Sequence, residues 1–171
     1  MSAINVRNVQ EVRRRTGAVH AEARIGRVTG EGLITTYAHH NGKIGVLVEV
    51  NCETDFVART DEFRTLARYL AEQIAATAPI AVDREQMPAD VVERKRLSFE
   101  AQVRALGKSQ DLAATIVDGK MDAYFRDVVL MDQAWVREPK IPIADLVKRV
   151  SVETGEAIRV RRFARFHMGI A

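Results

Sequence analysis

Histidine and cysteine, which commonly bind transition metals or act as nucleophiles, are rare in this sequence. There are four histidines, of which His39 and His40 are adjacent, and one cysteine, Cys52. Adjacent residues of a strand point to opposite faces, so a histidine pair there is a poor start for a metal site. Cys52 follows a run of branched apolar residues, which is typical of a small buried residue rather than a nucleophile. The sequence has no glycine-rich phosphate loop, Gly-x-Ser-x-Gly or His-Glu-x-x-His motif, so we expect no enzyme activity and no cofactor.

A more unusual stretch is Asn51–Arg59, which contains an aromatic residue where polar residues are the norm. It joins an apolar, strand-like run to a helix-like run and must therefore form a turn at the edge of a sheet. Phe56 in that turn needs an apolar environment. The residue pattern favours a ring that folds back under the following helix. The alternative is an exposed aromatic anchor, flanked by the carboxylate of Asp55, that enters a pocket of a partner protein.

The elements that position this turn begin with a β-hairpin. Two β-rich runs flank Asn41-Gly42, a dipeptide typical of tight hairpin turns because both residues tolerate positive φ. In the second run Ile44, Val46, Val48 and Val50 share one face, which we expect to be buried. The last segment, residues 158–168, begins as a strand whose alternation slips at Arg161-Arg162, as a β-bulge would cause. We expect this strand to pair with the hairpin.

Four helices are expected between the hairpin and the last strand. The first spans residues 60–77, with Thr60 as its cap and an apolar stripe that faces the core. The second runs from Pro88 to Gly107, and the third runs from Gln110 to Val128, punctuated by Gly119. A fourth covers residues 143–152 before Gly155, after an extended stretch around Trp135. The inward residues of these helices are Phe63, Leu66, Ala67, Leu70 and Ile74; Val92, Phe99, Val103 and Leu106; Met121, Tyr124, Phe125 and Val128; Leu146, Val147 and Val150.

This order of elements predicts an α+β fold, a three-stranded antiparallel sheet with helices packed on one face. A short N-terminal helix over residues 4–15 precedes it, so we divide the chain into residues 1–30, a short helix and linker, and residues 31–171, the core domain. The composition is that of a globular protein, with 47% hydrophobic and 29% charged residues. We find neither a membrane-spanning run nor a signal peptide and expect a cytoplasmic protein.

The phrase GVLVEVNCETDFVART closely resembles the signature of bacterial elongation factor Ts, the guanine-nucleotide exchange factor of elongation factor Tu. The resemblance continues through DEFRTLARYLAEQIA and LAATIVDGKMDAYFRDVVLMDQAWV to IRVRRFARF, over about residues 32–168. It implies a short, Thermus-type member with a single core domain and a shortened N-terminal domain. It also implies that Thr54, Asp55, Phe56 and Val57 enter the GTPase domain of elongation factor Tu and dislocate its Mg²⁺ ion.

The resemblance carries two further expectations. VQEVRRRTGA is similar to the end of the family's first helix, so Arg13, Thr16, Gly17 and Ala18 are expected to contact the GTPase domain as well. Thermus-type relatives also imply a homodimer formed through the core sheet.

Two other functions stay open. One is a paralogue that binds elongation factor Tu with weak or no exchange activity. The other, less favoured, is an RNA-binding module that uses the basic and aromatic residues of the last strand, although we expect no direct nucleic-acid partner. Those residues are Arg159, Arg161, Arg162, Phe163, Arg165 and Phe166.

Overall fold

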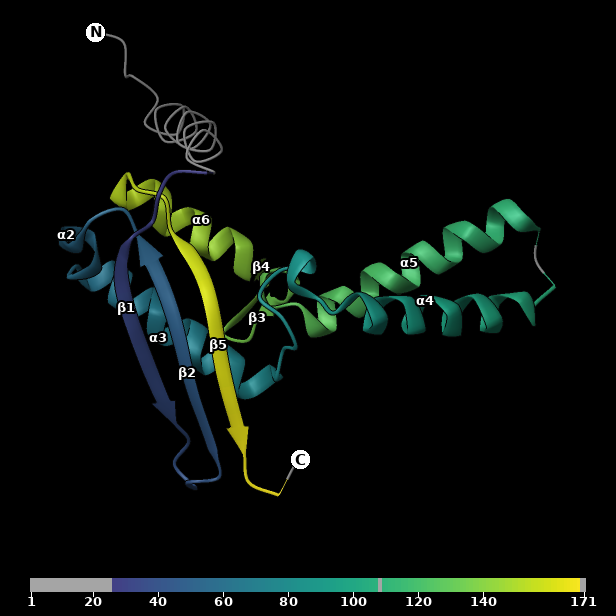
Figure 1. Cartoon of the computed structure of the whole chain (residues 1–171), viewed down its shortest axis with the longest axis horizontal. Coiled ribbons are helices and arrows are strands. Elements are labelled where there is room, and N and C mark those ends of the chain that lie inside the picture. Colours follow the sequence, from purple (N-terminus) through teal and green to yellow (C-terminus); the bar gives the residue numbers. More distant parts are fainter. Residues whose placement is uncertain (1–25, 108, 170–171) are drawn as a thin grey trace, which may run out of the picture.

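The computed structural model describes residues 26–107 and 109–169. The helix expected over residues 4–15, and with it Arg13, Thr16, Gly17 and Ala18, lies outside the described residues. Within them the chain forms a three-stranded antiparallel sheet, two helices that cover one face of it, and a pair of helices that extends away from it (Figure 1). The expected α+β class is confirmed.

The sheet consists of β1 (Glu31–Ala38), β2 (Ile44–Cys52) and β5 (Arg159–His167), in the order β1-β2-β5. The hairpin turn is as expected: Gly42 has a φ of +68°, and the Asn41 side chain accepts a hydrogen bond from the amide of Lys43 at 3.0 Å. Glu49 and Val50 are consecutive residues of β2, but their partners in β5, Arg162 and Val160, are two residues apart. The expected β-bulge is therefore confirmed, with Arg161 as the extra residue.

Helix α3 (Asp61–Thr77) covers the inner face of β1 and β2. Thr60 caps it by accepting a hydrogen bond from the amide of Phe63 at 3.3 Å. The expected apolar stripe is fully buried, and it packs on Val46, Val48 and Val50 of β2. Burying these side chains away from water is the main force that holds helix and sheet together.

Helix α6 (Ile143–Thr154) completes the core, and Gly155 caps its C-terminus. Leu146, Val147 and Val150 are buried, as expected, in the same cluster as α3. The extended stretch before α6 is a small hairpin of β3 (Ala134–Trp135) and β4 (Glu138–Pro142).

Helices α4 (Ala89–Arg104) and α5 (Gln110–Val128) form an antiparallel pair that projects from the core (Figure 1). We expected all four helices on one face of the sheet. Only α3 and α6 lie there, whereas α4 and α5 pack on each other. Helix α5 runs through Gly119 without a break. The expectation that Leu106 points inward is wrong: it is 60% exposed because α4 ends at Arg104 and Leu106 lies in the following turn.

Two 3-10 turns, η1 (Arg84–Gln86) and η2 (Leu130–Asp132), join this pair to the core. The guanidinium of Arg84 bridges Asp122 of α5 and Asp132 of η2, at 2.9 and 2.5 Å. Among the described residues, no helix combines the length and apolar character that crossing a membrane requires.

Candidate partner-binding site

The turn that contains Phe56 forms a short helix, α2 (Asp55–Ala58), between β2 and α3. Thr54 is its N-cap: the hydroxyl oxygen accepts a hydrogen bond from the amide of Val57 at 3.4 Å. The hydroxyl of Thr60, which caps α3, donates to the carbonyl of Val57 at 2.9 Å. Two successive caps therefore define both ends of α2.

Phe56 points into solvent because the other side of α2 is anchored in the core. Val57 and Ala58 are 4% and 8% exposed and belong to the main apolar cluster. With 3.6 residues per turn, Phe56 lies about 150° from the midpoint of those two anchors. Its ring is 77% exposed. The interpretation that the ring folds back under the following helix is therefore wrong, and the turn presents the exposed aromatic side chain that an anchor needs.

Asp55 lies beside the ring on the same turn. Its carboxylate forms an ion pair with Arg59, four residues later, at 2.6 Å. Both side chains are well exposed, so this pair contributes little to stability and water screens it. The carboxylate can accordingly exchange Arg59 for a donor on a partner at little cost.

Glu156, which sequence reasoning did not select, holds the start of this turn from the other end of the chain. Its carboxylate accepts hydrogen bonds from the amides of Glu53 and Thr54 at 3.1 and 3.0 Å, and from the Thr54 hydroxyl at 2.6 Å. The Glu53 carboxylate in turn accepts from the amide of Ala157 at 2.7 Å. The two positions are separated by more than 100 residues, so local pattern gives no signal for this contact.

Cys52 closes β2 directly beneath the turn and is fully buried, as expected of a small core residue. Its thiol donates a hydrogen bond to the carbonyl of Thr54 at 3.1 Å. Burial, followed by the nearby negative charge of Glu156, raises the pKa of the thiol from 9.0 to about 11. The thiol therefore stays protonated and unreactive at neutral pH.

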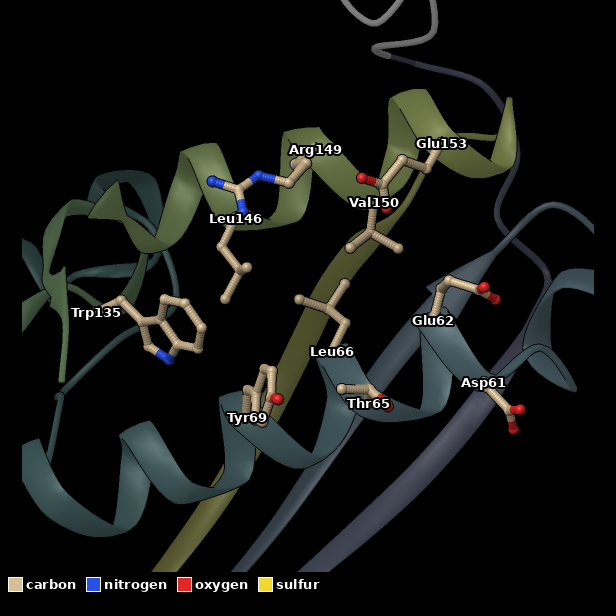
Figure 2. A pocket seen from close by; sticks show the side chains of 10 residues that line it. All are labelled: Asp61, Glu62, Thr65, Leu66, Tyr69, Trp135, Leu146, Arg149, Val150 and Glu153. Atoms are coloured by element: carbon tan, nitrogen blue, oxygen red, sulfur yellow. The ribbon is translucent and has the colours of Figure 1, made fainter. Parts of the chain in front are cut away.

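A shallow groove of about 410 Å³ runs between α3 and α6, starting next to α2. Figure 2 shows charged side chains along its rim and apolar ones at its floor. No residue of α2 lines this groove. The lining residues are Asp61, Glu62, Thr65, Leu66, Tyr69, Trp135, Leu146, Arg149, Val150 and Glu153.

The basic residues of β5 do not form one surface. The alternation of the strand turns Phe163 and Arg165 towards the core side, where Arg165 donates to the carbonyl of Ala75 at 3.1 Å. On the outer side, Arg162 pairs with Glu49 at 2.7 Å. This division gives no continuous row of arginines and aromatic rings on which a single strand of RNA could stack.

The outer face of the sheet carries apolar side chains with no second layer above them among the described residues. Ile34, Leu47 and Phe166 are 64%, 45% and 69% exposed, one on each strand. His39 and His40 lie beyond the end of β1, in the hairpin turn. No group of three potential metal ligands occurs within residues 26–107 and 109–169.

Comparison with known proteins places this architecture in a family. A family model described as "Elongation factor TS" matches residues 6–170. "Elongation factor Ts" of Desulfosudis oleivorans is 47% identical over 91% of this chain and 79% of its own length. The proteins of the same name from Thermotoga petrophila and an Anaeromyxobacter strain are 46% and 45% identical over 93% and 94% of this chain, and 79% and 73% of their own lengths. This chain therefore belongs to the elongation factor Ts family, a family of translation elongation factors.

Proposed function

We propose that this protein binds elongation factor Tu in its GDP state and promotes release of the nucleotide. The observation that carries the proposal is the exposed ring of Phe56, held on a turn whose opposite side is buried in the core. The family's intruding motif corresponds to Thr54, Asp55, Phe56 and Val57. In this chain Phe56 is the inserted side chain, Asp55 accompanies it, and Thr54 and Val57 hold the turn in place. The protein acts in the cytoplasm, as a non-enzymatic factor.

The physical basis of exchange is a competition between the ring and the metal site of the GTPase. Nucleotide affinity depends on a Mg²⁺ ion that bridges phosphate and protein oxygens. A ring that fits only the form of the GTPase in which this site is displaced lowers nucleotide affinity by the amount of its own preference. Burial of one aromatic side chain contributes about 2–3 kcal/mol, which corresponds to about 100-fold in affinity.

Two further contacts belong to this proposal. Arg13, Thr16, Gly17 and Ala18 add a second contact with the GTPase domain of elongation factor Tu. Two copies of the chain pair through the outer face of the sheet. The exposed apolar side chain on each of the three strands supports the second contact, because apolar side chains on an uncovered sheet face are typical of a surface that a second molecule covers.

The test is the release of labelled GDP from elongation factor Tu with catalytic amounts of the protein. Wild type should accelerate release, and Phe56→Ala should lose at least about 100-fold of the acceleration, the effect expected for one buried ring. The matched control is Phe166→Ala, which removes an equally exposed ring from the sheet and should leave exchange per protomer unchanged. Equal exchange by wild type and Phe56→Ala contradicts the proposed role of the ring.

The paralogue without exchange activity is a distinct outcome of the same experiment. In that case the protein binds elongation factor Tu at high concentration while GDP leaves at its spontaneous rate. This outcome retains the partner and rejects the exchange function.

A further inference from the structure

The segment between β2 and α2 leaves the sheet and needs hydrogen-bond partners outside it. After Cys52 the chain bends away from β1, so the amides of Glu53 and Thr54 have no strand to bond to. Both amides donate to one carboxylate oxygen of Glu156, at 3.1 and 3.0 Å. The other oxygen of Glu156 accepts from the Thr54 hydroxyl at 2.6 Å. One side chain therefore satisfies all three donors of this segment.

Glu156 is itself fixed by the end of α6. The hydroxyl of Ser151 donates to the backbone carbonyl of Glu156 at 2.6 Å, and the amide of the next residue, Ala157, donates to the Glu53 carboxylate at 2.7 Å. The turn after β2 and the segment after α6 are therefore linked in both directions. The Glu156 carboxylate accepts from the backbone of the turn, and the Glu53 carboxylate accepts from the backbone after α6. The link ties the turn to α6 and through it to the apolar core.

The bond to the Thr54 hydroxyl also orients the cap of α2. A hydroxyl has one hydrogen and two lone pairs. With the hydrogen donated to Glu156, a lone pair is left to accept the amide of Val57 at 3.4 Å, which is the bond that starts α2. Because the cap sets the direction of the first turn, it also sets the direction of the Phe56 side chain, two residues later.

The chemistry of the contact favours a carboxylate. All three groups that face Glu156 in this contact are donors, and an ionised carboxylate only accepts. Bonds to a charged acceptor are also stronger than bonds between neutral groups. A glutamine at this position could keep its carbonyl oxygen on the two amides, but its N–H group would then face the Thr54 hydroxyl, which would have to accept instead of donate, and the charge of the acceptor would be lost.

We propose that Glu156 is a positioning residue for nucleotide exchange, which acts by holding Thr54 and so aims the Phe56 ring at the partner. This inference rests on the proposed exchange function. A ring that must enter a cleft loses much of its effect when its direction is no longer fixed, because the ordering cost is then paid on binding. Glu156 itself needs no contact with the partner for this effect.

The test compares GDP release from elongation factor Tu by Glu156→Gln and by Glu138→Gln, the same substitution at an exposed position on β4. Glu156→Gln should slow catalysed release about tenfold, the loss expected when about 1.4 kcal/mol of preorganisation is removed. Glu138→Gln should equal wild type. Hydrogen exchange measured by NMR separates positioning from general destabilisation: the amides of Thr54 and Val57 should exchange faster in Glu156→Gln, while those of the α3 and β2 core keep their protection.

Several outcomes overturn the inference. If Phe56→Ala loses exchange and Glu156→Gln does not, Glu156 has no positioning role and the proposed function stands. If protection falls throughout the core of Glu156→Gln, the residue acts on the whole fold. If Phe56→Ala keeps full exchange, the ring does not promote release, and Glu156 cannot act by aiming it.

A second pair of variants decides the matter should Glu156→Gln not fold. Thr54→Val removes the hydroxyl that both bonds to Glu156 and caps α2, whereas Thr54→Ser keeps it. Thr54→Val should lose exchange, and Thr54→Ser should retain most of it. Equal exchange by the two variants overturns the inference.

Discussion

Phe56 and Phe166 are two phenylalanines with similar exposure and very different support. Their rings are 77% and 69% exposed. Phe56 is on a four-residue helix, next to a carboxylate, with buried anchors and a carboxylate-held cap behind it. Phe166 is on the edge strand β5, opposite Gly45, and shares its face with Leu47.

The difference teaches that exposure alone does not say what an aromatic side chain does. A ring that protrudes from a rigid turn suits a concave site on another protein. A ring that lies among other exposed side chains on the uncovered face of a sheet suits a matching face, which a second copy of the same chain provides under two-fold symmetry. The two sites can therefore be separated by experiment.

The largest effect that separates them is expected from Phe166→Asp. A carboxylate buried among apolar side chains at the interface must be desolvated without a partner, so we expect dimer dissociation to become at least about 100-fold easier. The fold should persist, because the substituted side chain is on the solvent side of the sheet in the monomer. Light scattering over a concentration series measures the change, and Phe56→Ala should scatter as wild type does. A dimer that survives Phe166→Asp contradicts pairing through this face.

The elements with strong local periodicity could be predicted from the sequence. The hairpin at Asn41-Gly42 and the bulge at Arg161 each follow from alternation and turn chemistry within a few residues. Helix α3 follows from its cap at Thr60 and a continuous apolar stripe. The helix pair α4–α5 could not be placed, because two amphipathic helices can bury their stripes against each other as well as against a sheet.

At the site, the residue pattern favoured the wrong direction for Phe56. Its exposure depends on which neighbours reach the core, and Val57 and Ala58 do so only once α3 and β2 are in place. Glu156 lay further out of reach of sequence reasoning, because an acidic residue after a helix cap is common and its partner is more than 100 residues away. Long-range hydrogen bonds of this kind leave no periodic pattern.

A smaller effect is the pH dependence of stability, which should involve Cys52 beneath the turn but not Phe166 on the outer face of the sheet. Because the pKa of the Cys52 thiol is raised from 9.0 to about 11 in the folded protein, folding stabilises the protonated form. This stabilisation, on the order of 3 kcal/mol, is fully present below pH 9 and is lost as the pH rises from 9 through 11. Urea unfolding from pH 8 to 11 should show wild type losing stability relative to Cys52→Ala. Parallel curves for the two proteins contradict the assignment, whereas Phe166→Ala should follow wild type.

The smallest effect concerns Asp55, whose contribution to exchange has to be separated from its ion pair. Asp55→Ala should slow GDP release about fivefold, less than Phe56→Ala, because a charge at an exposed rim contributes about 1 kcal/mol. The matched control is Arg59→Ala, which breaks the same 2.6 Å ion pair and leaves the carboxylate in place. If Asp55 acts by contacting the partner, Arg59→Ala should promote exchange as fast as wild type or slightly faster. In that variant the Asp55 carboxylate does not have to break an ion pair with Arg59 before it binds the partner. If the two variants are slowed equally, the ion pair supports α2 and Asp55 has no contact of its own.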